Sequence, residues 1–184
     1  MATDLIKLQN HYLDNIVPEL QKEFGIKNKH AVPKVKMVKL NVGLGPYVAA
    51  KKDYSEVVEN LASITGQKPI ITKARKAISN FKIRENVPVG VTVTLRGNKM
   101  YEFLNKLIHI TFPRVRDFRG ISPKSFDGNG NYSVGLKENI VFPEINPDNV
   151  NDIHGLQITV VTTAKDNDQG FKLLQLMGFP FKKQ

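Results

Sequence analysis

Residues 72–97 read TKARKAISNFKIRENVPVGVTVTLRG, and the two halves of this stretch differ in character. From 89 to 96 the chain alternates strictly between Val89, Val91, Val93 and Leu95 on one side and Gly90, Thr92, Thr94 and Arg96 on the other. This period of two predicts a strand with one buried face and one polar face. The first half is basic, with Glu85 opposed by Lys73, Arg75, Lys76, Lys82 and Arg84. A positive loop beside a flat polar face indicates a nucleic-acid surface, although a solvated edge hairpin would produce the same pattern.

The positive charge of the whole chain is concentrated around this stretch. The 184 residues carry a formal net charge of +10. Residues 61–124 hold 13 basic and 3 acidic side chains, whereas the segments before and after them have net charges of +2 and −2. Lysines kept only for solubility would not cluster in this way, so the distribution favours a polyanionic partner.

The composition excludes several kinds of site. The absence of cysteine excludes thiolate zinc sites, disulfides and cysteine nucleophiles. The four histidines show no ligand spacing, and the calcium-loop-like run that begins at Asp127 has Tyr132 where such a loop needs glycine. No carboxylates are paired beside a candidate nucleophile, so we expect no enzyme, no metal and no cofactor. No apolar run is long enough to span a membrane and no targeting segment is evident, so we expect a cytoplasmic protein.

The remaining periodic segments predict the order of elements. An apolar stripe over 1–25 predicts a helix that Pro18 can kink and Gly25 ends. We then expect a strand near 38–42, a helix at 51–64, strands at 68–73 and 89–96, and a helix from 98 that Pro113 stops. Alternating or periodic runs predict strands at 132–136 and 156–160 and a closing helix at 171–177.

From residue 38 to residue 136 this order is strand–helix–strand–strand–helix–strand. It matches the split βαβ pattern of ferredoxin-like folds, an α+β class in which helices cover one face of an antiparallel sheet. We expect a single domain over 1–184, with an N-terminal helix at 1–25 and an RNA-binding α+β domain at 35–184. That domain would carry a basic loop at 73–86 and a long arm at 112–131.

In such a fold the second face of the sheet stays open to solvent or to a partner. By alternation, it would carry Lys39, Asn41, Thr92, Thr94, Arg96, Gln157 and Thr159. Short hydrogen-bonding groups with few aromatics suit the backbone and minor groove of structured RNA. They do not suit the stacking of splayed single-stranded bases.

The arm interleaves cations with aromatic residues. Arg114, Arg116, Arg119 and Lys124 alternate with Phe112, Phe118 and Phe126. Two interpretations are equally open: aromatic side chains that pin a solvated loop to the core, or an arm that binds RNA or protein.

Several stretches together resemble the universal large-subunit ribosomal protein family that carries 5S ribosomal RNA, in its bacterial form. They are LNVGLG at 40–45, TGQKPIITKARKAISNFKIRE at 65–85, GVTVTLRG at 90–97, FPRVRDFRGISPKSFDGNGNYS at 112–133, FPEI at 142–145 and ITVVTTA at 158–164. The resemblance implies a non-enzymatic protein that helps attach 5S RNA in the central protuberance. It also implies partners in 23S-type RNA, neighbouring large-subunit proteins, the transfer RNA of the peptidyl site and a small-subunit head protein.

The resemblance also assigns residues to these contacts. The 5S-contacting positions would be Asn41, Gln67, Thr94 and Arg96, and we add the nearby Lys39 and Lys68. The loop that reaches transfer RNA would use Lys73, Arg75, Lys76, Lys82 and Arg84. For the intersubunit bridge we expect the arm, because its cations lie in its first half and its tip around Asp127 is neutral to acidic. The residues are Arg114, Arg116, Arg119, Lys124, Asp127 and Asn129. A stand-alone structured-RNA chaperone or regulator of the same fold is the alternative, and a purely protein-binding module is a third possibility.

Overall fold

The computed structural model describes residues 7–81, 83–147 and 152–182, and the chain divides into two compact units. The first unit comprises 1–38, 95–134 and 159–184, and the second comprises 39–94 and 135–158. The single domain expected over 1–184 stays a prediction, which one cooperative unfolding transition would support.

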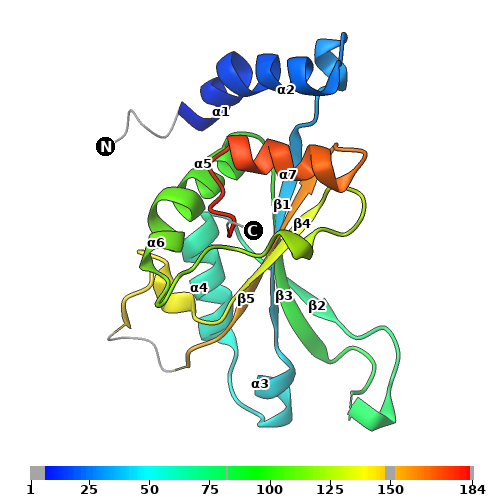
Figure 1. Ribbon diagram of the computed structural model, residues 1–184. Helices are drawn as coiled ribbons and strands as arrows, with labels where there is room; N and C mark the ends of the chain where they lie inside the picture. Colours follow the sequence, from blue (N-terminus) through cyan, green and yellow to red (C-terminus); the bar gives the residue numbers. More distant parts are fainter. Residues whose placement is uncertain (1–6, 82, 148–151, 183–184) are drawn as a thin grey trace. The chain divides into compact units, whose positions relative to one another are not determined.

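The fold is α+β, as the element order predicted. Its strands are β1 (Val35–Gly43), β2 (Ile70–Lys73), β3 (Pro88–Leu95), β4 (Tyr132–Leu136) and β5 (Leu156–Thr162). They form one five-stranded antiparallel sheet in the order β2-β3-β1-β5-β4 (Figure 1). The ferredoxin-like class is therefore confirmed.

The identity of the fourth strand of the split motif differs from the prediction. Sequence order assigned that place to residues 132–136, but β5 lies beside β1 and β4 takes the edge. The burial of the two strands explains the exchange. In β5, Leu156, Ile158 and Val160 are all buried, as an interior strand requires, whereas the shorter β4 has the exposed Gly135 near its end.

In the second unit, buried residues alternate with more exposed residues along β1 and β3, as predicted. The helix expected at 51–64 is α4 (Ser55–Thr65), and its buried side carries Val57, Leu61 and Ile64. It starts later than predicted because Asp53 accepts hydrogen bonds from both the amide and the hydroxyl of Ser55. A short helix α3 (Gly45–Ala49) lies between β1 and α4, and single 3₁₀ turns lie at Ser79–Phe81 and Asn139–Val141.

The first unit opens with a helix that changes its winding just before Pro18. It runs as α1 (Lys7–His11), a π-helical turn (Tyr12–Ile16) and α2 (Val17–Phe24), and it ends at Gly25 as predicted (Figure 1). In the π turn the amide of Val17 donates to the carbonyl of Tyr12, five residues back. The wider turn relieves the clash that a proline ring makes with the carbonyl four residues before it in an α-helix.

The same arrangement recurs at Pro113, which does not stop its helix as expected. The helix α5 (Gly97–Lys106) continues through a second π turn (Leu107–Thr111) into α6 (Phe112–Arg114). The amide of Phe112 donates to the carbonyl of Leu107, so the backbone is again wound loosely directly before the proline. The helix therefore ends at Arg114, two residues later than predicted.

The core of the first unit is built between its helices. The helix α1 packs on α5, and α2 packs on the closing helix α7 (Asn167–Leu176). Fully buried leucines lie on α2, α5, the π turn that follows α5, and α7: Leu20, Leu104, Leu107, Leu173 and Leu174. The remaining short elements of this unit are the 3₁₀ turns Lys29–Ala31 and Pro123–Ser125.

Candidate RNA-binding surface

The second unit carries a polar strip made of Lys39, Asn41, Gln67, Lys68, Thr72, Thr92 and Thr94. The first four side chains are exposed and the three threonines are half-buried. Lys39 and Asn41 alternate with the buried Val38, Leu40 and Val42 along β1, which is why they share a face. This surface contains every 5S-contacting position expected from the sequence except Arg96.

Hydrogen bonds to backbone carbonyls fix three side chains of the strip. Gln67 Nε2 donates to the Thr94 carbonyl at 3.3 Å, so these two predicted residues are in contact. The Thr72 hydroxyl donates to Gly90 and the Thr92 hydroxyl donates to Leu40, both at 3.0 Å. Each hydroxyl uses its single proton in this bond, so its oxygen can only accept further hydrogen bonds. Ribose 2′-hydroxyls can donate to it.

Gly90 brings two members of the strip close together across β3. A Cβ at this buried glycine would lie 3.1 Å from both Thr72 Oγ1 and the Val42 carbonyl, and 3.7 Å from Asn41 Oδ1. A side chain at 90 would therefore crowd Thr72 and the strand that carries Asn41. The small residue in GVTVTLRG keeps the strip flat at this point.

Arg96 belongs to the first unit, whereas the rest of the predicted 5S-contacting set belongs to the second. Its side chain is exposed, and Nη2 donates to Met37 Sδ at 3.6 Å. The guanidinium keeps most of its five donors available for an external acceptor.

The basic loop is an ordered extension of the β2–β3 hairpin. Ile70 pairs with Thr92 and Thr72 with Gly90, and the register shifts at Thr72/Lys73. Farther out, Ile78 and Ile83 exchange two backbone hydrogen bonds of 2.9 and 3.2 Å. The cations at 73, 75, 76 and 84 are all exposed, as predicted, and Lys82 lies outside the described residues.

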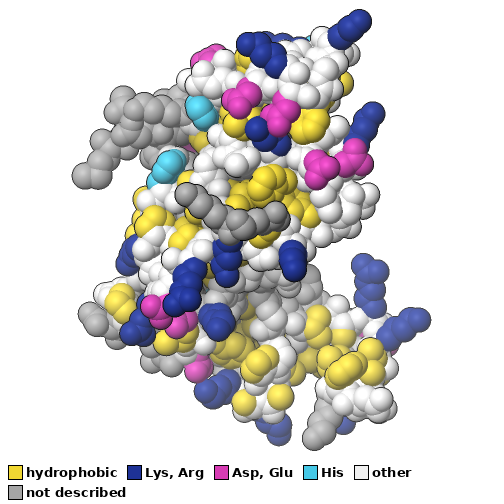
Figure 2. Space-filling model, in the orientation of Figure 1, with side chains coloured by type: hydrophobic (Ala, Val, Ile, Leu, Met, Phe, Trp, Pro, Cys, Tyr) yellow, Lys and Arg dark blue, Asp and Glu magenta, His cyan; other side chains and the backbone are white. Residues whose placement is uncertain are grey.

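Sequence reasoning missed the apolar side chains of this loop. Phe81 and Ile78 are 72% and 46% exposed, and Ile70, which is 69% exposed, lies before the loop on β2, opposite Thr92. Figure 2 shows apolar side chains next to cations over the β2–β3 hairpin, at the lower right. The prediction from sequence rested on the cations alone, although Ile78 and Phe81 lie between Lys76 and Lys82 in KAISNFK. An exposed aromatic side chain in a basic loop can stack on a nucleotide base.

In the first unit, the aromatic residues of the arm face inward and its cations face outward. Phe112 is buried and stacks on Phe118 at 5.4 Å between ring centroids, and Phe126 packs on Tyr132 at 4.8 Å. The exposed cations are Arg114, Arg116, Arg119 and Lys124. The aromatic side chains therefore pin the arm to its unit, which leaves the cations as the groups that can meet a partner.

The tip of the arm is a hydrogen-bonded turn. Asp127 Oδ1 accepts from the amides of Asn129 and Asn131, and its Oδ2 accepts from the Asn131 side chain at 2.7 Å. These bonds, that of the Asn131 side chain first, hold the pKa of Asp127 below its usual value. Asn167 Oδ1 accepts from Gly128 and Gly130, which fastens the tip to α7. The Asp127 carboxylate thus organises the turn, while Asn129 is exposed.

The described part of the chain contains neither a metal-binding cluster nor a membrane-spanning helix. Among residues 7–81, 83–147 and 152–182, no group of three or more His, Cys, Asp or Glu could hold a metal ion. No helix in the same residues is long and apolar enough to cross a membrane.

Comparison with known proteins identifies the family. Residues 28–84 match the model described as ribosomal protein L5, and residues 88–181 match the ribosomal L5P family C-terminus. The large ribosomal subunit protein uL5 of Thermotoga maritima is 53% identical, with complete coverage of both chains. Those of Desulfatibacillum aliphaticivorans and Colwellia psychrerythraea are 53% and 52% identical over 96% and 98% of this chain, and over 98% and 99% of their own lengths.

These matches extend over both compact units of the chain. They cover nearly the whole chain, including the stretch at 72–97. The chain belongs to the ribosomal protein L5 family and is a ribosomal protein rather than an enzyme.

Proposed function

We propose that this protein is a structural constituent of the large ribosomal subunit that binds 5S ribosomal RNA and helps attach it in the central protuberance. The observation that carries the proposal is the polar strip, in which Gln67 is bonded to Thr94 and Gly90 leaves no room for a side chain between Thr72 and the Val42 carbonyl. Such a surface carries no aromatic side chain, and hydrogen bonds already hold the side chains of Gln67, Thr72 and Thr92 in place. It therefore loses little conformational entropy when a rigid RNA helix docks.

The strip would divide the work of binding between charge and geometry. Lys39 and Lys68 would neutralise phosphates, which makes the affinity salt-dependent. Asn41, Gln67 and the threonines would form short hydrogen bonds to ribose and base edges, which set the register of the RNA. Arg96 would add phosphate contacts from the first unit.

The β2–β3 loop would reach the transfer RNA in the peptidyl site. Its exposed cations at 73, 75, 76 and 84 form no core, so their favourable partner is a polyanion. Phe81 at the same tip would add a stacking surface. Because the loop extends beyond the paired part of β2 and β3, its contacts would be separable from those of the strip.

The arm would form a bridge to a protein of the small-subunit head. Its outward cations, from Arg114 to Lys124, would lie near 23S-type RNA and neighbouring large-subunit proteins. The turn at 127–131 would meet the head protein through Asn129, with Asp127 holding the turn in shape. A small polar contact of this kind can break and re-form as the subunits rotate.

Two measurements test this proposal. A ribosomal constituent should remain near-stoichiometric in large subunits after a high-salt wash, whereas an RNA chaperone would be sub-stoichiometric and a protein-binding module absent. In a binding assay with isolated 5S RNA, Asn41→Ala and Arg96→Ala should each weaken affinity by about 1–3 kcal/mol, since each leaves a polar partner unpaired.

Asn98→Ala serves as the matched control for Asn41→Ala, because Asn98 is exposed and lies on α5 rather than on the strip. Wild-type affinity in a folded Asn41→Ala/Arg96→Ala double variant would remove the assignment of the strip to 5S RNA.

A further inference from the structure

The second unit contains a cavity that none of the proposed contacts uses. It has a volume of about 430 Å³ and is lined by Gly43, Pro46, Tyr47, Ala50, Lys52, Asp152, Ile153, His154 and Gly155. This volume lies within the range of small-molecule sites. The lining comes from the end of β1, the short helix α3 and the segment that leads into β5.

An orphaned acceptor lies in the wall of this cavity. His154 is only 7% exposed, and its Nε2 is buried with no hydrogen-bond partner among the described residues. Its Nδ1 lies 3.4 Å from the Gly155 carbonyl, which can only accept, so Nδ1 carries the proton and Nε2 is left as the acceptor. Burial lowers the pKa of His154, which keeps the ring neutral at pH 7. A ligand that donates an N–H would satisfy Nε2.

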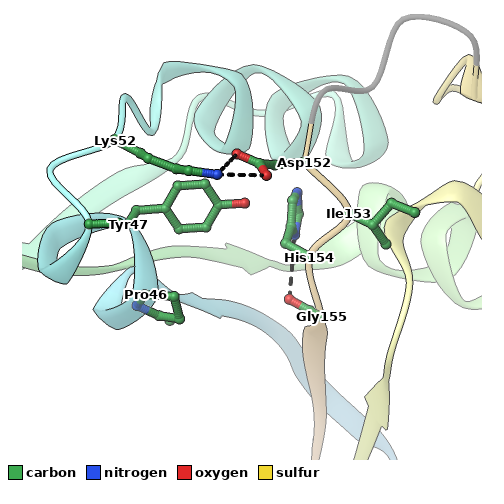
Figure 3. Close-up of a pocket in the computed structure, with 9 residues that line it drawn as sticks. Pro46, Tyr47, Lys52, Asp152, Ile153, His154 and Gly155 are labelled. Atoms are coloured by element: carbon green, nitrogen blue, oxygen red, sulfur yellow. Dashed lines mark hydrogen bonds and ion pairs between the residues drawn. The ribbon is translucent and has the colours of Figure 1, made fainter.

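A donor stands beside this acceptor. Figure 3 shows the Tyr47 hydroxyl pointing toward the His154 ring. Burial, with Asp152 and Glu56 adding to it, raises the pKa of Tyr47, so the hydroxyl keeps its proton at neutral pH. The lining of the cavity thus includes an acceptor and a donor as well as the apolar residues Pro46, Ala50 and Ile153.

The charges of the cavity cancel within it. Lys52 Nζ lies 3.3 and 3.4 Å from the two carboxylate oxygens of Asp152, along one side of the cavity (Figure 3). A phosphate would have to compete with Asp152 for this lysine. The favoured occupant is therefore neutral, amphipathic and able both to donate and to accept a hydrogen bond. The Watson–Crick edge of an unpaired nucleobase has these properties.

The cavity lies at the end of β1, the strand that carries Lys39 and Asn41 of the polar strip. Gly43, in its wall, is two residues beyond Asn41 on β1, so the two lie on the same face and about 7 Å apart. Lys51, beside the cavity in sequence, is exposed and could meet the phosphates that flank an inserted base. An RNA that lies on the strip at Asn41 would therefore be about two residues of β1 away from the wall of the cavity.

We propose that the cavity holds one unstacked nucleobase of the RNA bound on the polar strip, with the base edge between His154 Nε2 and the Tyr47 hydroxyl. This inference rests on the proposed RNA-binding function, and the experiment has one part that does not depend on it. The RNA pays the cost of unstacking the base, and the hydrogen bonds to the two buried groups offset that cost.

The first part uses the full chain without RNA. Adenosine, guanosine, cytidine and uridine 5′-monophosphates are titrated separately while the ring signals of His154 and Tyr47 are followed by NMR. At least one should give a saturable shift with a dissociation constant on the order of millimolar. Ribose 5-phosphate should give none, since it lacks the base. Tyr47→Phe and His154→Phe should each weaken the response about tenfold, as expected when a buried polar contact is lost.

His109→Phe is the matched control, because His109 is exposed on the π turn after α5 and lies outside the cavity. Tyr47→Phe retains every ring carbon, so it tests the inference even if His154→Phe fails to fold. No saturable shift from any of the four nucleotides would overturn the proposal.

The second part uses the complex with 5S RNA. Chemical probing of the Watson–Crick edges should find one nucleotide that is protected by the wild-type protein and reactive with His154→Phe, while the rest of the footprint is retained. Identical footprints would overturn the proposal and leave the 5S function standing. If the wild-type chain does not bind 5S RNA, the proposed function fails and the nucleotide titration alone decides the cavity.

A photo-crosslinker at Ile153 identifies the occupant directly, since this residue lines the cavity and is 60% exposed. In assembled large subunits the products should be with RNA. Products only with another protein would overturn the proposal, because they would show that a protein segment fills the cavity.

Discussion

The side-chain amide of Gln67 donates a hydrogen bond to the backbone carbonyl of Thr94, 3.3 Å away. This bond joins the residue that precedes β2 to the strand β3, which follows it after the basic loop. It leaves Oε1 of the same amide as an acceptor for an external partner. The bond therefore presents Gln67 in a fixed orientation on the polar strip.

Replacing Gln67 with glutamate should separate binding from stability. Gln67→Glu removes the donor to Thr94 and places a negative charge on the strip, so affinity for 5S RNA should fall by about 1–3 kcal/mol. Folding stability should fall by no more than about 1.5 kcal/mol, because only one exposed hydrogen bond is lost. Gln175→Glu makes the same charge change on the exposed side of α7 and should leave binding unchanged. Equal losses in the two variants would attribute the effect to net charge alone.

Gly90→Ala should destabilise the protein by about 1–3 kcal/mol. The new methyl group would meet Thr72 Oγ1 and the Val42 carbonyl at 3.1 Å, and the carbonyl belongs to a strand that cannot move freely. Urea denaturation measures the effect. Gly135→Ala on β4 is the control, since a Cβ there meets nothing within 4 Å. Similar midpoints for the two variants would show that β1 and β2 can yield to the added group.

Phe81→Ala should leave folding stability within about 0.5 kcal/mol of wild type, because the side chain is 72% exposed. If the ring stacks on a base of transfer RNA, occupancy of the peptidyl site in assembled ribosomes should fall, at a cost of about 1–3 kcal/mol. Phe81→Tyr keeps the aromatic plane and should restore occupancy. Normal occupancy of the peptidyl site with Phe81→Ala would show that the loop contacts transfer RNA through its cations and not through this ring.

Stability should depend on the protonation of His154. Burial lowers the pKa of this ring in the folded state, and the Gly155 carbonyl and Glu56 oppose that shift without cancelling it. The unfolded chain therefore takes up the proton first, near its ordinary pKa of about 6.5. The contribution of the neutral ring is complete above about pH 7.5 and is lost as pH falls through 6.5 toward the lower folded pKa.

Urea denaturation at several pH values checks this linkage. His154→Phe should flatten the dependence between about pH 7.5 and 5.5, whereas His109→Phe should retain the wild-type slope. The groups around His154 that also titrate or carry charge are Tyr47, Lys52, Glu56 and Asp152. Parallel curves for wild type and His154→Phe would contradict the assignment.

Asp127→Ala should loosen the tip of the arm. It removes the acceptor of two backbone amides and of the Asn131 side chain, so exchange of the amides at 129 and 131 with solvent should accelerate. The 5S affinity should be retained, and subunit association should weaken if the turn forms the bridge. Cross-links from Asn129 only to large-subunit RNA would exclude a contact of the tip with the small-subunit head.

The elements that the sequence predicts correctly are those with a strong local period. The strand at 89–96 and the helices around Leu61 and Leu174 follow from the spacing of apolar residues alone, because burial of one face decides them. Strand order does not follow, since the place of β5 beside β1 depends on which distant segment buries more surface. The two π turns also escape prediction, because they depend on a shift in backbone hydrogen bonding and not on side-chain type.

The candidate site shows the same division. Alternation placed Asn41 and Thr94 on a common face, and the contact of Gln67 with Thr94 supports that grouping. Phe81 was missed because charge dominates its neighbourhood. The cavity could not be predicted, since Tyr47 and His154 are far apart in sequence and each is an isolated polar residue with no motif around it.

The π turns before Pro18 and Pro113 link the presence of each proline to the number of residues in the helix before it. Each turn holds one residue more than an α-helical path of the same rise, so buried residues on its two sides stand one residue farther apart in sequence than in a regular α-helix. Deleting one residue from 12–16 would restore an α-helical path that keeps Leu8 and Leu20 on the same buried side, but the ring of Pro18 would then clash with the carbonyl four residues before it. Replacing the proline alone would leave the extra residue without a reason to remain extruded. The proline and the additional residue therefore depend on each other, and a regular α-helix would return without strain only if both were removed.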